Sequence, residues 1–134
     1  MIHLPKQVEY ALMALAEMQQ GKPGQLFSVR ALTKTLGVPY DVAGKALQGM
    51  AHAGILRSVQ GKYGGYQIAR DLAGVSLEDL MRAVVGTRAI ANCLESGHAC
   101  PHRGSCAIRR GIVRIEAKLR AFLDSISLQD ILAV

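Results

Sequence analysis

Residues 55–70 have the sequence ILRSVQGKYGGYQIAR. Two short runs with β-branched and aromatic residues, 55–60 and 66–70, flank the glycine-rich segment 61–65. This pattern predicts a strand, a tight turn and a second strand, which together form a two-stranded hairpin. The glycines are typical of a hairpin turn rather than a phosphate-binding loop, because no Lys-Ser or Lys-Thr pair follows them and no helix begins there.

Two short helices are predicted directly before the hairpin. Ser28 is a candidate N-cap for the first, and Gly37 is suited to end it. Pro39 favours the start of the second, where its missing N–H has no cost, and Gly54 follows the end of that helix. The expected buried faces are Val29, Leu32 and Leu36 in the first helix, and Val42, Ala46, Leu47 and Met50 in the second. Two such helices and a hairpin predict a winged helix-turn-helix, with the second helix as the recognition helix.

Three more helices are predicted. Apolar spacing predicts one over residues 8–19 and a long one that begins near residue 106. Ser76 is a candidate N-cap with Glu78 and Asp79 in the first turn, and it predicts a helix over residues 76–85. Residues 87–106 have weak periodicity and are expected to be mainly loop. The long helix carries a heptad-like seam at spacings of 4, 3, 4, 3 and 4, formed by Ile108, Ile112, Ile115, Leu119, Phe122 and Ile126. Such a seam favours a homodimer over packing on the chain's own core.

The predicted fold class is mainly α with a small β-hairpin. We expect a winged helix-turn-helix DNA-binding domain at 1–75, followed by a cysteine loop and a long dimerisation helix at 76–134. No stretch approaches the length of a membrane span and no signal peptide is visible, so we expect a cytoplasmic protein without membrane contact.

The charge is concentrated where the DNA-binding domain is predicted. The formal net charge is +6, and residues 1–70 hold eight Lys and Arg against three acids. Such a surface suits the phosphates of double-stranded DNA, in which a palindromic operator would match a symmetric dimer. The candidate DNA contacts are Ser28, Arg30, Lys34, Tyr40, Asp41, Lys45, Arg57 and Lys62.

The three cysteines, Cys93, Cys100 and Cys106, fall within one short stretch. Thiolates are strong ligands for soft metals, and the intervening Gly97 and Gly104 let the loop turn. Segments of six and five residues separate the cysteines, whereas structural zinc favours pairs separated by two to four. The cysteines are therefore candidate ligands of an iron–sulfur cluster.

The chain resembles the family of winged-helix regulators that includes IscR, NsrR and RirA. The residues that carry the resemblance are Tyr10-Ala11, Val38-Pro39, Gly54-Ile55-Leu56-Arg57-Ser58, Gly61-x-x-Gly64-Gly65-Tyr66-x-Ile68-Ala69-Arg70 and the three cysteines. It implies a homodimeric transcription factor that senses nitric oxide, redox state or iron–sulfur supply through a cluster of 2Fe–2S or 4Fe–4S type. Members commonly have five residues between the first two cysteines, so the six found here are a departure.

The fourth cluster ligand stays open. One pattern in the family places a histidine three residues after the last cysteine, but this chain has Arg109 there. Another places an acidic residue from the partner subunit just before the Tyr-Ala pair, and Glu9 occupies that position. His98 and His102 are local alternatives, because imidazole also binds iron. An exogenous ligand, or none, is a further alternative.

Other readings of the cysteines also stay open. Cys100 lies beside Pro101, His102 and Arg103, where a lowered pKa would suit a cluster-free thiol switch. A zinc site completed by a histidine is a second alternative. An enzyme is not expected, because the chain has no evident nucleophile–base pair, carboxylate pair or nucleotide-binding motif.

Overall fold

The computed structural model describes residues 3–95, 97 and 99–133. It is mainly helical, with one two-stranded antiparallel sheet, so the predicted fold class is confirmed. The elements are α1 (Lys6–Gln19), α2 (Val29–Leu36), α3 (Tyr40–His52), β1 (Leu56–Val59), β2 (Gly65–Ile68), the 3-10 turn η1 (Leu72–Gly74), α4 (Leu77–Val85), the 3-10 turn η2 (Asn92–Leu94), α5 (Arg109–Asp124) and α6 (Leu128–Leu132).

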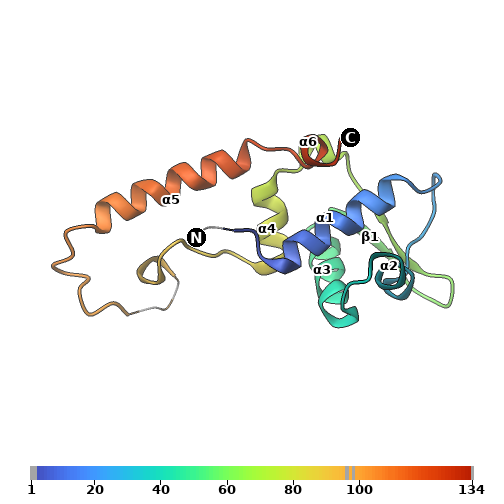
Figure 1. Cartoon of the computed structure of the whole chain (residues 1–134), viewed down its shortest axis with the longest axis horizontal. Coiled ribbons are helices and arrows are strands. Elements are labelled where there is room, and N and C mark those ends of the chain that lie inside the picture. Colours follow the sequence, from blue (N-terminus) through green and yellow to red (C-terminus); the bar gives the residue numbers. More distant parts are fainter. Residues whose placement is uncertain (1–2, 96, 98, 134) are drawn as a thin grey trace.

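The molecule is elongated. In Figure 1, α1 to α4 and the hairpin form a body at one end, and α5 extends from it toward the other end. The chain between α4 and α5 makes a long excursion beside α5 toward the far end. All three cysteines belong to this stretch of the chain. The segment with the candidate ligands therefore lies away from the recognition helix of its own chain.

The helix-turn-helix forms where the local signals predict it. The Ser28 Oγ accepts a hydrogen bond from the Ala31 N–H at 3.1 Å, and Gly37 ends α2 with a positive φ of 68°. Pro39 is the N-cap of α3. Each of these signals acts on the backbone within a few residues, so the start and end of these helices do not depend on distant parts of the chain.

The hairpin pairs Leu56 with Ile68 and Val59 with Gly65. Its turn is closed by a hydrogen bond from the Gly64 N–H to the Gly61 carbonyl at 3.0 Å. A third segment supports it, because Phe27 and Tyr66 exchange two backbone hydrogen bonds of 2.9 Å each. The wing is thus tied to the segment that leads into α2.

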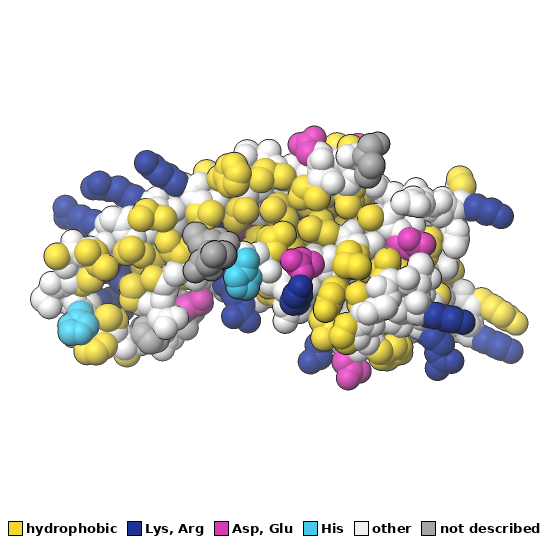
Figure 2. Space-filling model, viewed as in Figure 1, with side chains coloured by type: hydrophobic (Ala, Val, Ile, Leu, Met, Phe, Trp, Pro, Cys, Tyr) yellow, Lys and Arg dark blue, Asp and Glu magenta, His cyan; other side chains and the backbone are white. Residues whose placement is uncertain are grey.

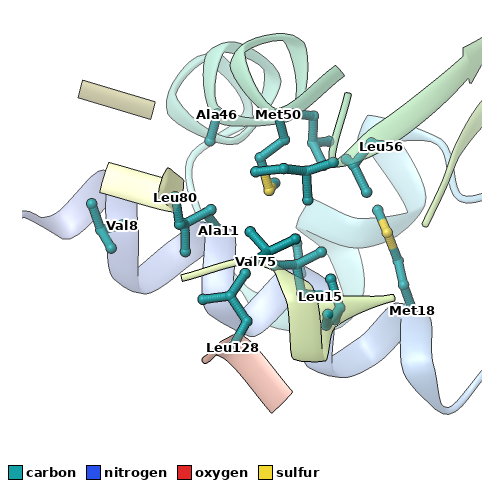
Figure 3. Packing of buried hydrophobic residues seen from close by; sticks show 14 of the residues in the cluster. Val8, Ala11, Leu15, Met18, Ala46, Met50, Leu56, Val75, Leu80 and Leu128 are labelled. Carbon is teal, nitrogen blue, oxygen red and sulfur yellow. The ribbon is translucent and has the colours of Figure 1, made fainter. Parts of the chain in front are cut away.

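The core joins α1, α3, the hairpin, α4 and α6 (Figure 3). Val8, Leu15 and Leu128 are 0% exposed and belong to one cluster. The backbone also holds the C-terminal segment in place, since the Leu128 N–H donates to the Val75 carbonyl at 2.8 Å. The division into 1–75 and 76–134 stays a prediction, and the core draws on both parts.

Some boundaries and faces differ from the expectation. The helix expected at 8–19 begins at Lys6, and the long helix begins at Arg109 instead of near residue 106. Ala43 is buried in α3, whereas Val42, expected on the buried face, is only half-buried. The 3.6-residue period of the helix allows either residue to face the core, and α2 and α1 pack against the side that carries Ala43.

Candidate functional site

The eight candidate DNA contacts all lie on the surface of the winged-helix body. Tyr40 is 59% exposed at the start of α3, and the other seven are also exposed. The Ser28 hydroxyl caps α2, so this side chain has a structural role as well. Together they place basic and polar groups on α2, on the exposed side of α3, and on the hairpin.

The tip of the wing carries an aromatic residue that sequence reasoning missed. Lys62 and Tyr63 are the two central residues of the turn between Gly61 and Gly64. The Tyr63 side chain is 84% exposed, and the Lys62 Nζ lies 5.6 Å from its ring centroid. An aromatic ring with so little packing stabilises the fold weakly. The sequence did offer a signal for the exposure of Tyr63: it lies between the turn glycines, and the central residues of a turn project outward.

The cysteine side chains are free and half-buried. Cys93 lies in η2, Cys100 in the following loop, and Cys106 shortly before α5. Within residues 3–95, 97 and 99–133, no three His, Cys, Asp or Glu side chains are grouped closely enough to hold a metal ion. Three free thiols in one loop are the donor set that an iron–sulfur cluster takes, so the residues fit the group chemically. The loop would need to close to gather them.

The candidate fourth ligands have different surroundings. Glu9 lies in the first turn of α1, with its side chain 44% exposed and 3.0 Å from the Lys6 ammonium. The side-chain hydrogen bond to Glu9 and the charge of that carboxylate raise the pKa of Lys6. His102 is exposed in the cysteine loop, and His98 lies outside the described residues. None of these side chains meets the cysteines in a metal-binding group among the described residues.

Helix α5 presents a large apolar face to solvent. Ile108, Ile115 and Phe122 are 67%, 52% and 61% exposed, and their spacing of seven residues puts them on one side. Figure 2 shows hydrophobic side chains spread over the α5 side of this view, with Lys and Arg at both ends of the molecule. Two other residues of the predicted seam face the body: Leu119 lines the cavity beside α4, and Ile126, just after α5, packs against the core.

The helix-turn-helix, the paired strands and the exposed basic side chains define the class of the protein as a winged-helix DNA-binding protein. The model of the Rrf2 family, described as "Iron-dependent Transcriptional regulator", matches residues 4–134. The chain therefore belongs to the Rrf2 family of transcriptional regulators, as the motifs of the wing and cysteine loop predict.

Individual relatives agree with this assignment. The chain is similar to the HTH-type transcriptional repressor NsrR of Streptomyces coelicolor, with 30% identity over 123 residues that cover 92% of this chain and 81% of NsrR. The structure of CymR, the global cysteine regulator of B. subtilis, matches with a TM-score of 0.69 and 21% identity, covering 99% of this chain and 98% of CymR. The structure of IscR from T. potens matches with a TM-score of 0.66 and 20% identity, covering 98% and 86%. At these identities the two structures show the fold alone.

No helix in the described part of the chain combines the length and the apolar character needed to cross a membrane.

Proposed function

We propose that this protein is a DNA-binding regulator that senses nitric oxide, redox state or iron–sulfur status through a cluster on Cys93, Cys100 and Cys106. The observation that carries the proposal is the combination of three free thiols in one loop with a winged helix-turn-helix. The match to a family described as iron-dependent supports the metal. When bound, a cluster supplies an iron centre that reacts with nitric oxide and oxygen and changes its charge on reduction.

The DNA side of the proposal rests on exposed residues of the body. Lys45 and Tyr40 lie on α3, the helix that would enter the major groove, and Arg57 and Lys62 lie on the wing. For the basic residues, phosphate contact is the first role we assign, since phosphates take most protein–DNA hydrogen bonds. No catalytic role is proposed for any residue.

A homodimer is part of the proposal. A partner would bury the exposed apolar side chains of α5, and a second copy of the same helix offers matching heptad positions. A dimer would also let Glu9 of one subunit serve as the fourth ligand beside the cysteines of the other. A carboxylate is a weak iron ligand beside three thiolates, which suits a site that must react.

Dimer geometry gives the cluster a way to affect DNA binding. Two recognition helices must be about 34 Å apart to enter successive major grooves on one side of the duplex. A ligand that ties one subunit's α1 to the other's cysteine loop would fix this separation. We therefore expect the state of the cluster to change the affinity for a palindromic operator.

Purification without oxygen tests the cofactor. We expect a coloured protein with iron and acid-labile sulfide, and loss of both when any one of Cys93, Cys100 and Cys106 is replaced by Ser. Far-UV circular dichroism of each variant controls for folding. A colourless wild-type protein that also fails to take up iron and sulfide on reconstitution would refute the cluster.

A second candidate is a cluster-free regulator on the same fold. The three cysteines are free thiols, as this candidate requires. The fold is also that of CymR, whose structure is named as that of a cysteine regulator. Selective oxidation of one cysteine in an iron-free protein would support a thiol switch, and a colourless, stoichiometric zinc content would support a zinc site.

A further inference from the structure

One charged side chain joins the cysteine loop, α5 and the DNA-binding body. The Arg120 guanidinium, on α5, uses all three of its nitrogens. Its Nη1 donates to the Glu78 carboxylate at 2.6 Å, its Nη2 donates to the Arg88 carbonyl at 2.8 Å, and its Nε is paired with Glu116 at 2.6 Å. Three separate parts of the chain therefore meet at one cation.

The loop side of this junction has a second attachment. The other Glu116 oxygen accepts a hydrogen bond from the Ile90 N–H at 2.9 Å. The Glu116 side chain is only 14% exposed, and that of Arg120 is 31% exposed. Charge-assisted hydrogen bonds in such partly buried positions are stronger than those on an open surface. Residues 88 and 90, which begin the excursion toward Cys93, are thus fixed to α5 by ionic groups.

The body side of the junction is buried. The Glu78 residue, on α4, is 6% exposed, and its carboxylate also lies 3.4 Å from Arg82. A carboxylate removed from water needs a cationic partner, because an unpaired buried charge is strongly unfavourable. Arg120 lies 42 residues further along the chain and provides the closer partner. The position of α4 is therefore tied to that of Arg120.

Helix α4 packs closely against the recognition helix, α3. The backbone of Gly49, in α3, lies so close to the Ala83 carbonyl of α4 that a Cβ on Gly49 would overlap this oxygen. Two helices in such close contact move together, because packed interiors transmit displacements rather than absorb them. A shift of α4 would reach α3 through this contact.

The start of the loop borders a cavity. A cavity of about 260 Å³ lies between α4, α5, residues 86–90 and the N-terminal segment with His3 and Pro5, and Met81, Leu119 and Leu123 are in its wall. Among the described residues, side chains leave this space open, and the bonds of Arg120 and Glu116 attach residues 88 and 90 to α5 beside it. A change in the loop would therefore act on α4 through these ionic groups.

We propose that Arg120 is a positioning residue that transmits the state of the cysteine loop through Glu78 and α4 to the recognition helix. The inference rests on the proposed function, in which the loop is the sensing element. It adds the route inside one subunit by which that element reaches the DNA-binding surface. Linkage requires the route to work in both directions, so DNA bound at α3 must also alter the loop.

The effect of bound DNA on the cysteine loop can be tested in protein without a cluster. Amide hydrogen exchange over residues 87–95 would be measured by mass spectrometry in metal-free protein, with and without DNA. The DNA is a duplex selected by the wild-type protein from a random-sequence library. We expect DNA to change the exchange of this segment in the wild type, and the change to disappear in Arg120→Met. Arg114→Met is the matched control, because Arg114 is an exposed α5 cation that forms no ion pair within the described chain.

The DNA-induced change in amide exchange distinguishes an Arg120 that transmits the state of the loop from an Arg120 that only stabilises the fold. A purely structural Arg120 would raise exchange equally with and without DNA, leaving the DNA-induced difference intact. If Arg120→Met does not fold, Glu116→Ala removes the Ile90 attachment, leaves the Glu78 pair in place, and is expected to reduce the difference. An equal DNA-induced difference in wild type and variants overturns the proposal, and so does the absence of any difference in the wild type. Neither result depends on iron, so failure of the cluster proposal is recognised separately.

Discussion

Replacing Lys62 with alanine should weaken DNA binding and make it less sensitive to salt. Lys62 occupies a central position in the wing turn and forms no ion pair in the described part of the chain, so its loss leaves the fold intact. Each phosphate contact contributes about 0.9 to the slope of log K against log salt concentration on B-form DNA. Two wings of a dimer would therefore make the slope shallower by about 1.8, whereas one wing would change it by about 0.9.

The neighbouring Tyr63 supplies a matched comparison. The side chain is 84% exposed and lacks the ammonium group of its neighbour, so Tyr63→Ala should lower the affinity without changing the slope. An aromatic side chain buries about 150–250 Å² when fully covered. Covering about 100 Å² of it against the sugar and base edges corresponds to at most about 2.5 kcal/mol per wing, at about 25 cal/mol per Å². The two variants thus separate the electrostatic from the apolar contribution at one turn.

Fluorescence anisotropy titrations of the selected duplex at several salt concentrations measure both quantities. Arg114→Met is again a suitable control, because it removes one positive charge from α5 and leaves the wing unchanged. An unchanged slope in Lys62→Ala would show that Lys62 makes no phosphate contact. Equal slope changes in Lys62→Ala and Tyr63→Ala would show that the whole wing had moved, and would refute the assignment of separate roles.

Three further predictions concern the ligand, the core and the dimer. Glu9→Ala should shorten the lifetime of the cluster in air or alter its visible spectrum while circular dichroism stays the same, and an unchanged spectrum and lifetime would remove Glu9 as a ligand. Leu128→Ala should lower the free energy of unfolding by about 2–5 kcal/mol in urea titrations, because this side chain is 0% exposed in the core. Less than about 1 kcal/mol would mean that α6 contributes little to the core. Phe122→Glu should convert a dimer to a monomer in sedimentation velocity experiments, and an unchanged mass would place the subunit contact elsewhere.

The features with local signals could be predicted from the sequence. Ser28, Gly37 and Pro39 each act on the backbone within a few residues, so the two helices of the helix-turn-helix follow from them. The hairpin follows for the same reason, because its glycine-rich turn lies between two short apolar runs. The wing motif and the cysteine loop together were specific enough to indicate the family that the comparison confirms.

Features that depend on distant parts of the chain could not be predicted. Leu128 brings α6 into the same buried cluster as Val8 near the start of the chain, and no periodicity within α6 indicates that it enters this core. The pairing of Glu78 with Arg120 spans 42 residues, and both looked like ordinary helix charges. The sequence predicted the apolar seam of α5. Which of its residues face the body and which are exposed depends on the orientation of α5 relative to the body, and no local signal sets that orientation.

The central claim is that a cluster on the cysteine loop controls DNA binding. It is tested most directly by measuring the dissociation constant of the selected duplex for iron–sulfur-loaded and metal-free protein, without oxygen and at one salt concentration. We predict that the two constants differ by about fivefold or more, the lower end of typical coupling between sites. Equal constants for protein shown to hold iron and sulfide would contradict the claim.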